Sequence, residues 1–157
     1  MPVSALRSCD DNTMSENSRE VREVSVVRTA SRTYKATSAI TGSSIEFGQA
    51  EGLLTPVELL LAAIAGCSSI DVDVATTRRS EPEKFEVTAS GDKLTEDGAS
   101  RMEDIRLGFD LKFPDTEEGR KAAGMVERIV KLSHDKYCTV SRTVELGAKV
   151  TSEIVKS

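Results

Sequence analysis

The chain has 157 residues, enough for one domain that buries a core without disulfide bonds. Charged residues make up 30% and hydrophobic residues 38%, and no apolar run stands out as membrane-spanning, which predicts a soluble globular protein. Acidic residues outnumber Lys and Arg by 26 to 21 without any basic cluster, so we expect neither nucleic acid nor a membrane as a partner. Three cysteines and no secretory apolar segment after Met1 indicate a reducing, cytoplasmic location.

The first part of the chain, residues 1–20, is rich in Ser, Asn and Asp and shows no regular periodicity. It predicts a disordered tail ahead of a single domain at 21–157. Cys9 lies in this tail without a partner nearby, as an incidental thiol. Whether translation starts at Met1 or Met14 stays open.

Short strands are predicted after Val21. Apolar residues alternate with charged ones around Val24, and a second alternating run follows Thr33, which is typical of a hairpin. A third strand is expected over 42–47, before a loop over 48–54. Arg28 and Arg32 flank the first turn, where paired arginines usually face solvent.

A long apolar helix is predicted over 55–74, and it is expected to be buried because it is apolar nearly all round. Thr55 as N-cap, Pro56 at the first helical position and Glu58 three residues after the cap form a capping box. Cys67 lies in the middle of this helix, with Asp71 one turn later on the same expected buried stripe. That stripe is predicted to contain Leu60, Ala63, Ile64, Cys67, Ile70 or Asp71, and Val74.

The second half predicts two strands, a helix and a final strand. Apolar residues alternate over 85–89 and over 105–113 with a turn at 92–100 between them, and another alternation at 146–154 is expected to form the last strand. A helix begins near Asp115 or Thr116, and its apolar stripe is Ala122, Met125, Val126, Ile129, Val130 and Leu132. This order of elements indicates an α+β domain with an antiparallel sheet.

The two cysteines outside the tail suggest thiol chemistry. There is no CxxC pair and His134 is the only histidine, so neither a metal nor a cofactor is expected. Burial in apolar surroundings raises a thiol pKa, so Cys67 would need a nearby positive charge to react as a thiolate. Arg28, Arg32 and Arg142 are the candidates.

Cys138 is expected near the start of a short helical run, a position that lowers a thiol pKa. If the fold brings the two Cα atoms to roughly 4.4–6.8 Å, a sulfenic acid on one cysteine can be resolved by the other as a disulfide.

The segments TPVELLLAAIAGCSSIDV and, beyond it, HDKYCTVSRTVELGAKV resemble the OsmC/Ohr family, the osmotically induced and organic hydroperoxide resistance proteins. The resemblance extends over about residues 21–154. It implies the OsmC-like fold, with antiparallel sheets packed on a long buried central helix, and an intertwined homodimer with sites at the subunit interface.

The resemblance also implies that Cys67 is the peroxidatic and Cys138 the resolving cysteine, and that an arginine of the first hairpin turn takes part. Arg32 is our candidate, with Arg28 in reserve. The family's glutamate directly follows the proline, where this chain has Val57. Glu58 is one residue later and opposite Cys67 on a straight helix, so it is a cap unless it serves the other subunit's site. Asp71 has the better placement within the helix.

The resulting hypothesis is a cysteine-based peroxidase that reduces organic hydroperoxides, since apolar walls desolvate an alkyl group. The family suggests a dithiol reductant, either a lipoyl protein or thioredoxin. Two alternatives remain: a small-molecule-binding dimer that has kept the fold, and a redox sensor that forms the Cys67–Cys138 disulfide without turnover.

Overall fold

A computed structural model describes residues 18–157. Most of the predicted tail, with Cys9 and Met14, lies outside the described residues. The chain forms two compact units that divide between Ala50 and Glu51.

The first unit contains a three-stranded antiparallel sheet in the order β1-β2-β3. Tyr34 and Phe47 are paired across β2 and β3, and their ring centroids lie 5.8 Å apart. The predicted strands are confirmed, with bounds β1 (Val24–Ala30), β2 (Thr33–Ser38) and β3 (Ser44–Gly48).

The turn between β1 and β2 holds Arg32 in a left-handed conformation, with φ of 53°. Gly48 makes this turn possible, because a Cβ on Gly48 would come within 2.0 Å of the Arg32 carbonyl oxygen. The same oxygen accepts a hydrogen bond of 2.9 Å from the backbone N–H of Gln49. Arg32 is therefore fixed through its backbone while its side chain is exposed.

The second unit begins with helix α1 (Pro56–Thr76), and its predicted capping box is present. Glu58 donates its backbone N–H to the Thr55 hydroxyl at 3.3 Å, and its carboxylate accepts the backbone N–H of Thr55 at 2.7 Å. The remaining elements are β4 (Lys84–Glu96), β5 (Ala99–Lys112), α2 (Glu117–Leu132), a π-helical turn η1 (Ser133–Tyr137) and α3 (Thr139–Leu146).

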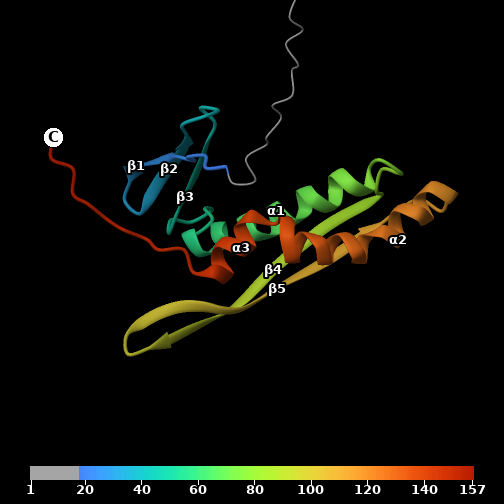
Figure 1. Ribbon diagram of the computed structural model, residues 1–157. Helices are drawn as coiled ribbons and strands as arrows, with labels where there is room; N and C mark the ends of the chain where they lie inside the picture. The colour runs from blue at the N-terminus through green and yellow to red at the C-terminus, as the bar shows by residue number, and fades with distance from the viewer. Residues whose placement is uncertain (1–17) are drawn as a thin grey trace, which may run out of the picture. The chain divides into compact units, whose positions relative to one another are not determined.

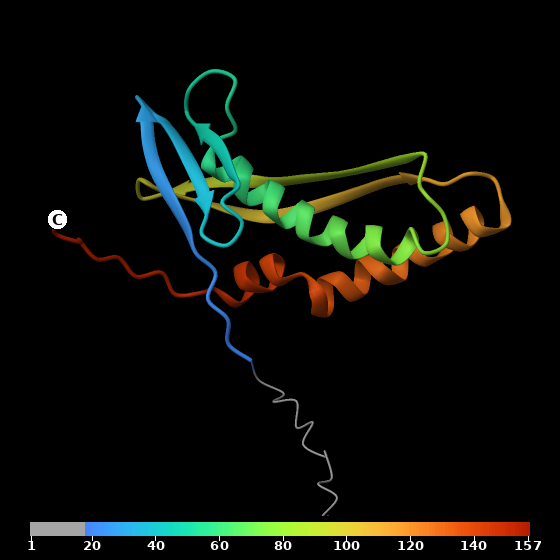
Figure 2. The ribbon, with the colours of Figure 1, turned by 90° about the horizontal axis from the view of Figure 1, so that it is seen from above.

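Strands β4 and β5 form a long antiparallel hairpin, and α1 runs along it in contact with β4 (Figures 1 and 2). Helix α2 packs beside α1, and η1 and α3 contact α1 as well. Apolar residues pair across the hairpin on its half-buried face, as with Val87 opposite Phe109. The two faces of the hairpin thus follow the predicted alternation, and this arrangement is the α+β fold that the sequence predicts.

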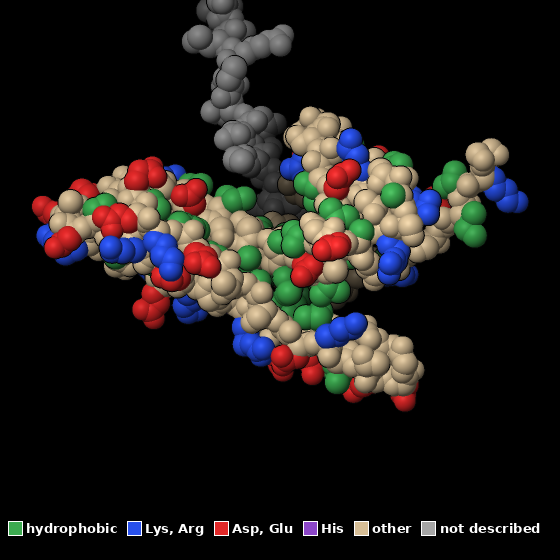
Figure 3. Space-filling view, turned by 180° about the vertical axis from the view of Figure 1, so that it is seen from behind, with side chains coloured by type: hydrophobic (Ala, Val, Ile, Leu, Met, Phe, Trp, Pro, Cys, Tyr) green, Lys and Arg blue, Asp and Glu red, His purple; other side chains and the backbone are tan. Residues whose placement is uncertain are grey.

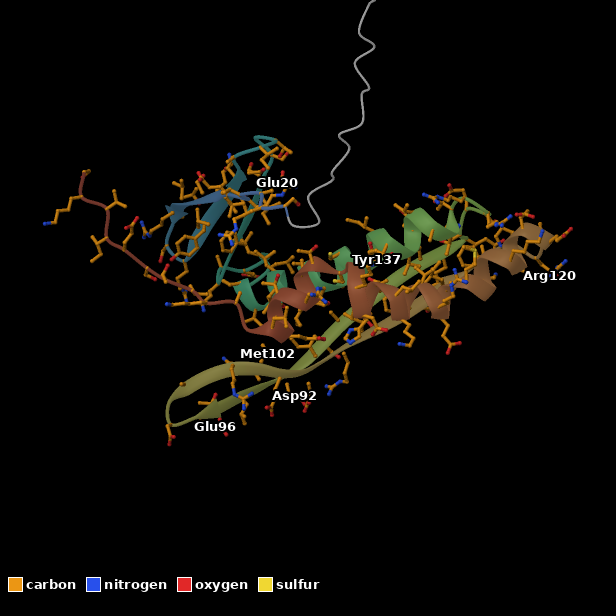
Figure 4. All side chains as sticks on the ribbon, in the orientation of Figure 1. Glu20, Asp92, Glu96, Met102, Arg120 and Tyr137 are labelled. Atoms are coloured by element: carbon orange, nitrogen blue, oxygen red, sulfur yellow. The ribbon has the colours of Figure 1, made fainter. Side chains whose placement is uncertain are left out.

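The free end of the hairpin, residues 92–106, carries many charged side chains and is called the arm below. Arg101 forms ion pairs with Glu96 and Glu103, and Arg106 pairs with Asp92 at 3.1 Å. Figure 3 shows charged atoms of both signs on this arm and hydrophobic atoms gathered where the arm begins. Asp92, Glu96 and Met102 mark the arm in Figure 4.

The buried face of α1 differs from the predicted stripe. Its buried residues are Ile64, Ala65, Ser68, Val72 and Thr76. Cys67 and Asp71 are half-buried beside this stripe, and Ile70 and Val74 are exposed. A helix that is apolar nearly all round gives hydrophobic periodicity no clear phase, which explains the error.

By length and composition, α1 could also cross a membrane, which the sequence prediction did not anticipate. In the structure it contacts α2, α3 and β4 and carries buried hydroxyl groups. Only 28% of its apolar window is buried, so the expectation of a helix buried nearly all round is wrong and α1 buries a single face.

Two further predictions are wrong. The expected turn at 92–100 is much shorter, because β4 continues to Glu96 and only Asp97 and Gly98 connect it to β5. The expected strand at 146–154 is absent: α3 ends at Leu146, Gly147 caps it at φ of 65°, and residues 148–157 have no regular structure. Alternation alone does not make a strand, because a strand also needs a partner for its backbone groups.

Candidate functional site

Cys67 and Cys138 come together in the second unit, although 70 residues separate them in the chain. Cys67 is half-buried in the middle of α1. Cys138 is fully buried at the junction of η1 and α3, and its thiol interacts with that of Cys67. Of the two sulfurs, Cys67 is the more accessible to an incoming molecule.

Cys138 is the N-cap of α3. Its thiol donates to the Ser141 hydroxyl at 3.1 Å and accepts the Ser141 backbone N–H at 3.4 Å. The Cys138 backbone is extended, with φ of −72° and ψ of 95°, as N-cap residues are. A sulfur thus takes the place that a Ser or Asp oxygen usually occupies at a helix start.

Opposing influences act on the Cys67 thiol. Burial raises its pKa and is the largest influence; the backbone N–H of Val140 lowers it, the Cys138 thiol raises it and the backbone N–H of Thr139 lowers it. The net pKa lies above the usual value, because the amides at the start of α3 offset burial only in part. Cys67 thus faces a helix N-terminus, which favours an anion, but needs further positive charge to become a thiolate near neutral pH.

A buried polar network lies beside the two cysteines. Ser133 donates its hydroxyl to the Asp71 carboxylate at 2.6 Å, and the Ser68 and Ser133 hydroxyl oxygens are 3.1 Å apart. Ser133 is fully buried and Ser68 is 3% exposed. Asp71 was recognised in the sequence as well placed, but Ser133 and Ser141 were not, because nothing in their local pattern distinguishes them from other serines.

A cavity of about 240 Å³ is lined by neighbours of the two cysteines, although neither cysteine lines it. Ile64 and Ser68, which flank Cys67 in α1, contribute to its wall, and so does Ser141, which binds the Cys138 thiol. His134 and Glu145 are its titratable residues, with 3.6 Å between His134 Nε2 and Glu145 Oε1. The rest of the lining is apolar: Ile105, Leu107, Phe109 and Val130.

Glu58 lies at the first turn of α1, where its carboxylate accepts hydrogen bonds from the backbone N–H and hydroxyl of Thr55. These two bonds lower the pKa of Glu58. It is therefore occupied in the capping box, nine residues before Cys67.

The predicted arginines are exposed. Arg28 and Arg32 belong to the first unit, in β1 and in the turn after it, and Arg142 lies in α3. Among residues 18–157, none of the three takes part in an ion pair, so their guanidinium groups carry uncompensated charge. In the same part of the chain, no group of three or more His, Cys, Asp or Glu side chains is arranged to hold a metal ion.

Comparison with known proteins shows which family the chain resembles. Residues 48–153 match the family described as OsmC-like protein. An uncharacterized protein of Mycobacterium tuberculosis is 29% identical over 133 residues, which cover 83% of this chain and 93% of the relative.

Solved structures of other proteins are similar to this chain as well. A hypothetical protein from Aquifex aeolicus matches with a TM-score of 0.63 and 29% identity, covering 82% of this chain and 90% of that chain. The organic hydroperoxide resistance protein OhrB of Bacillus subtilis matches with a TM-score of 0.52 and 19% identity, covering 82% of this chain and 93% of that chain. At that identity the second likeness concerns the fold alone.

Proposed function

Because the chain belongs to the OsmC-like protein family, we propose that it is a thiol-dependent peroxidase that reduces organic hydroperoxides. The observation that carries this proposal is the interaction between the half-buried Cys67 thiol and the buried Cys138 thiol. The fold shared with a protein named for organic hydroperoxide resistance supports it.

In the first step, the Cys67 thiolate attacks the distal oxygen of the hydroperoxide. The S–O bond forms as the O–O bond breaks, which leaves a sulfenic acid on Cys67 and an alkoxide that takes up a proton to become an alcohol. Cys67 is assigned this role because Cys138 is fully buried and cannot meet a peroxide first.

The thiolate needs a positive charge that α1 does not supply. Burial raises the pKa of Cys67, and the amides of Val140 and Thr139 compensate only partly. Arg32 is proposed to supply the charge, with Arg28 in reserve, because a guanidinium is always charged and can hold the thiolate and a peroxide oxygen together. Its freedom from ion pairs among the described residues supports this role.

In the second step, the Cys138 sulfur attacks the sulfur of the Cys67 sulfenic acid. Water leaves and a disulfide forms between the two residues. A dithiol then reduces the disulfide and is itself oxidised to a disulfide; a lipoyl protein or thioredoxin is the proposed donor. A homodimer in the cytoplasm is the proposed working form.

The apolar cavity lined by neighbours of the two cysteines supports an organic substrate. Its wall includes four large apolar side chains from β5 and α2, which favour an alkyl or aryl group over water. A hydroperoxide with an apolar substituent gains from this wall, whereas hydrogen peroxide does not.

The test is the consumption of cumene hydroperoxide with dithiothreitol as the reductant. The parent protein should turn over and Cys67→Ser should not. Cys138→Ser should turn over more slowly than the parent, because its sulfenic acid can be resolved only by dithiothreitol itself. Cys67→Ser with the activity of the parent would refute the proposal. A reversible Cys67–Cys138 disulfide without turnover would instead identify a redox sensor.

A further inference from the structure

We propose that Ser133 and Asp71 are positioning residues that hold the Cys138 segment against α1 and thereby set the rate of disulfide formation with Cys67. This inference rests on the proposed function for its kinetic meaning. Its structural basis is the buried network that joins α1 to the first residue of η1.

The network has a defined direction. Ser133 has one hydroxyl proton, and it donates that proton to Asp71 at 2.6 Å. In the 3.1 Å contact with Ser68, Ser133 is therefore the acceptor and Ser68 the donor. The chain of hydrogen bonds runs from the Ser68 hydroxyl through the Ser133 hydroxyl to the Asp71 carboxylate. It ends there because an ionised carboxylate accepts hydrogen bonds and donates none.

The network is also linked to the Cys138 backbone. The carbonyl oxygen of Ser133 accepts the backbone N–H of Cys138 at 2.8 Å, which closes the π-helical turn. Ser133 therefore binds Asp71 with its side chain and Cys138 with its backbone. Tyr137, labelled in Figure 4, marks the end of this turn just before Cys138.

The same stretch of α1 carries Cys67. Ser68 is the next residue after Cys67, and Asp71 follows one helical turn later. Both sulfurs are thereby held relative to one rigid segment of five residues. A shift of Ser133 would move Cys138 and leave Cys67 in place.

The Asp71 carboxylate acts on Ser133 and not on the peroxidatic sulfur. The groups that shift the pKa of Cys67 are its own burial, the Cys138 thiol and two backbone amides, and Asp71 is not one of them. Among residues 18–157, Asp71 is in no ion pair either. Its short bond to a fully buried hydroxyl is therefore its principal contact.

The experiment separates the two chemical steps in the full-length chain with Cys9→Ser. Single-turnover reaction with cumene hydroperoxide is followed by trapping of the sulfenic acid and by loss of free thiol. Ser133→Ala and Asp71→Ala should slow disulfide formation about tenfold or more, because a displaced reacting group reacts much more slowly, and should leave sulfenic acid formation unchanged. The trapped sulfenic acid should accumulate accordingly.

Conservative variants distinguish positioning from general damage. Ser133→Thr keeps the hydroxyl and Asp71→Asn keeps an acceptor oxygen, so both should resolve as the parent does. Asp73→Ala is the matched control, because Asp73 is an exposed carboxylate on the same helix. Equal slowing of both steps in Ser133→Ala, or slowing in Ser133→Thr as large as in Ser133→Ala, would overturn the proposal.

A second measurement does not depend on peroxidase activity. In glutathione redox buffers, Ser133→Ala should lower the equilibrium constant for the Cys67–Cys138 disulfide about tenfold, which is about 30 mV for this two-electron couple. A shift in a protein that consumes no peroxide would support positioning and refute the peroxidase. An unshifted equilibrium and an unchanged resolution rate in an active protein would refute positioning alone.

Discussion

Arg32 occupies a backbone position that favours glycine, and replacing it with glycine should separate stability from activity. Its φ of 53° places it in the left-handed region, which costs a residue with a side chain about 1–2 kcal/mol. Glycine avoids this strain but loses about 0.5–1 kcal/mol more conformational freedom on folding. Arg32→Gly should therefore leave the free energy of unfolding equal to that of the parent or raise it by about 1 kcal/mol.

Asp97 provides a matched control, because it lies in the β4–β5 turn with φ of 50°. Asp97→Gly should change the free energy of unfolding by a similar amount, measured by urea denaturation. Only Arg32→Gly should lose peroxidase activity, measured as kcat/KM for cumene hydroperoxide. If Arg32→Gly retained the kcat/KM of the parent, Arg32 would not be the activating charge. If it lost more than about 1 kcal/mol of stability, the argument from strain would fail.

The remaining predictions concern α1. Thr55→Ala should lower the unfolding free energy by about 1 kcal/mol in urea denaturation, since it removes the N-cap. Glu58→Gln should keep the kcat/KM of the parent, because Glu58 serves the capping box. Loss of turnover in Glu58→Gln would contradict this role. Burial raises the pKa of Cys67, so the pH midpoint of its alkylation by iodoacetamide should lie above that of a free cysteine when Arg28 and Arg32 are both alanine, and lower in the parent. In that double variant, the protonated Cys67 thiol contributes its full stability below about pH 8.5, and this stability is lost as the pH rises through the folded-state pKa. Cys67→Ser should abolish this pH dependence of the unfolding free energy. Equal alkylation midpoints in the parent and the double variant would exclude activation by these arginines.

Local sequence signals predicted the parts of the fold that depend on neighbours in the chain. The Thr55 capping box, the alternation around Phe109 and the apolar stripe of α2 each arise from residues a few positions apart. The structure confirms all three, apart from Leu132, which is exposed at the end of the stripe.

The sequence was less informative about burial that depends on packing between elements distant in the chain. The buried face of α1 includes Ser68 and Thr76, which a hydrophobic pattern does not select. Thr76 is buried at little cost because its hydroxyl donates to the carbonyl oxygen of Val72 at 2.9 Å. The burial of Ser68 depends on Ser133, 65 residues away, and no local pattern reveals such a bond.

The candidate site was predicted in part. The family resemblance pointed to Cys67 and Cys138, and the structure places them near enough that the Cys138 thiol raises the pKa of Cys67. The capping of α3 by Cys138 fits the expected helical start, but the bond to Ser141 and the amides facing Cys67 depend on tertiary packing. The roles of Arg32 and Arg28 remain predictions.

The most direct test of the thiol-pair mechanism is the intact mass of the protein after one equivalent of cumene hydroperoxide, followed by peptide mapping. We expect a loss of two hydrogens, with the bond mapped between Cys67 and Cys138. Overoxidation of Cys67 alone, with Cys138 still a free thiol, would contradict it.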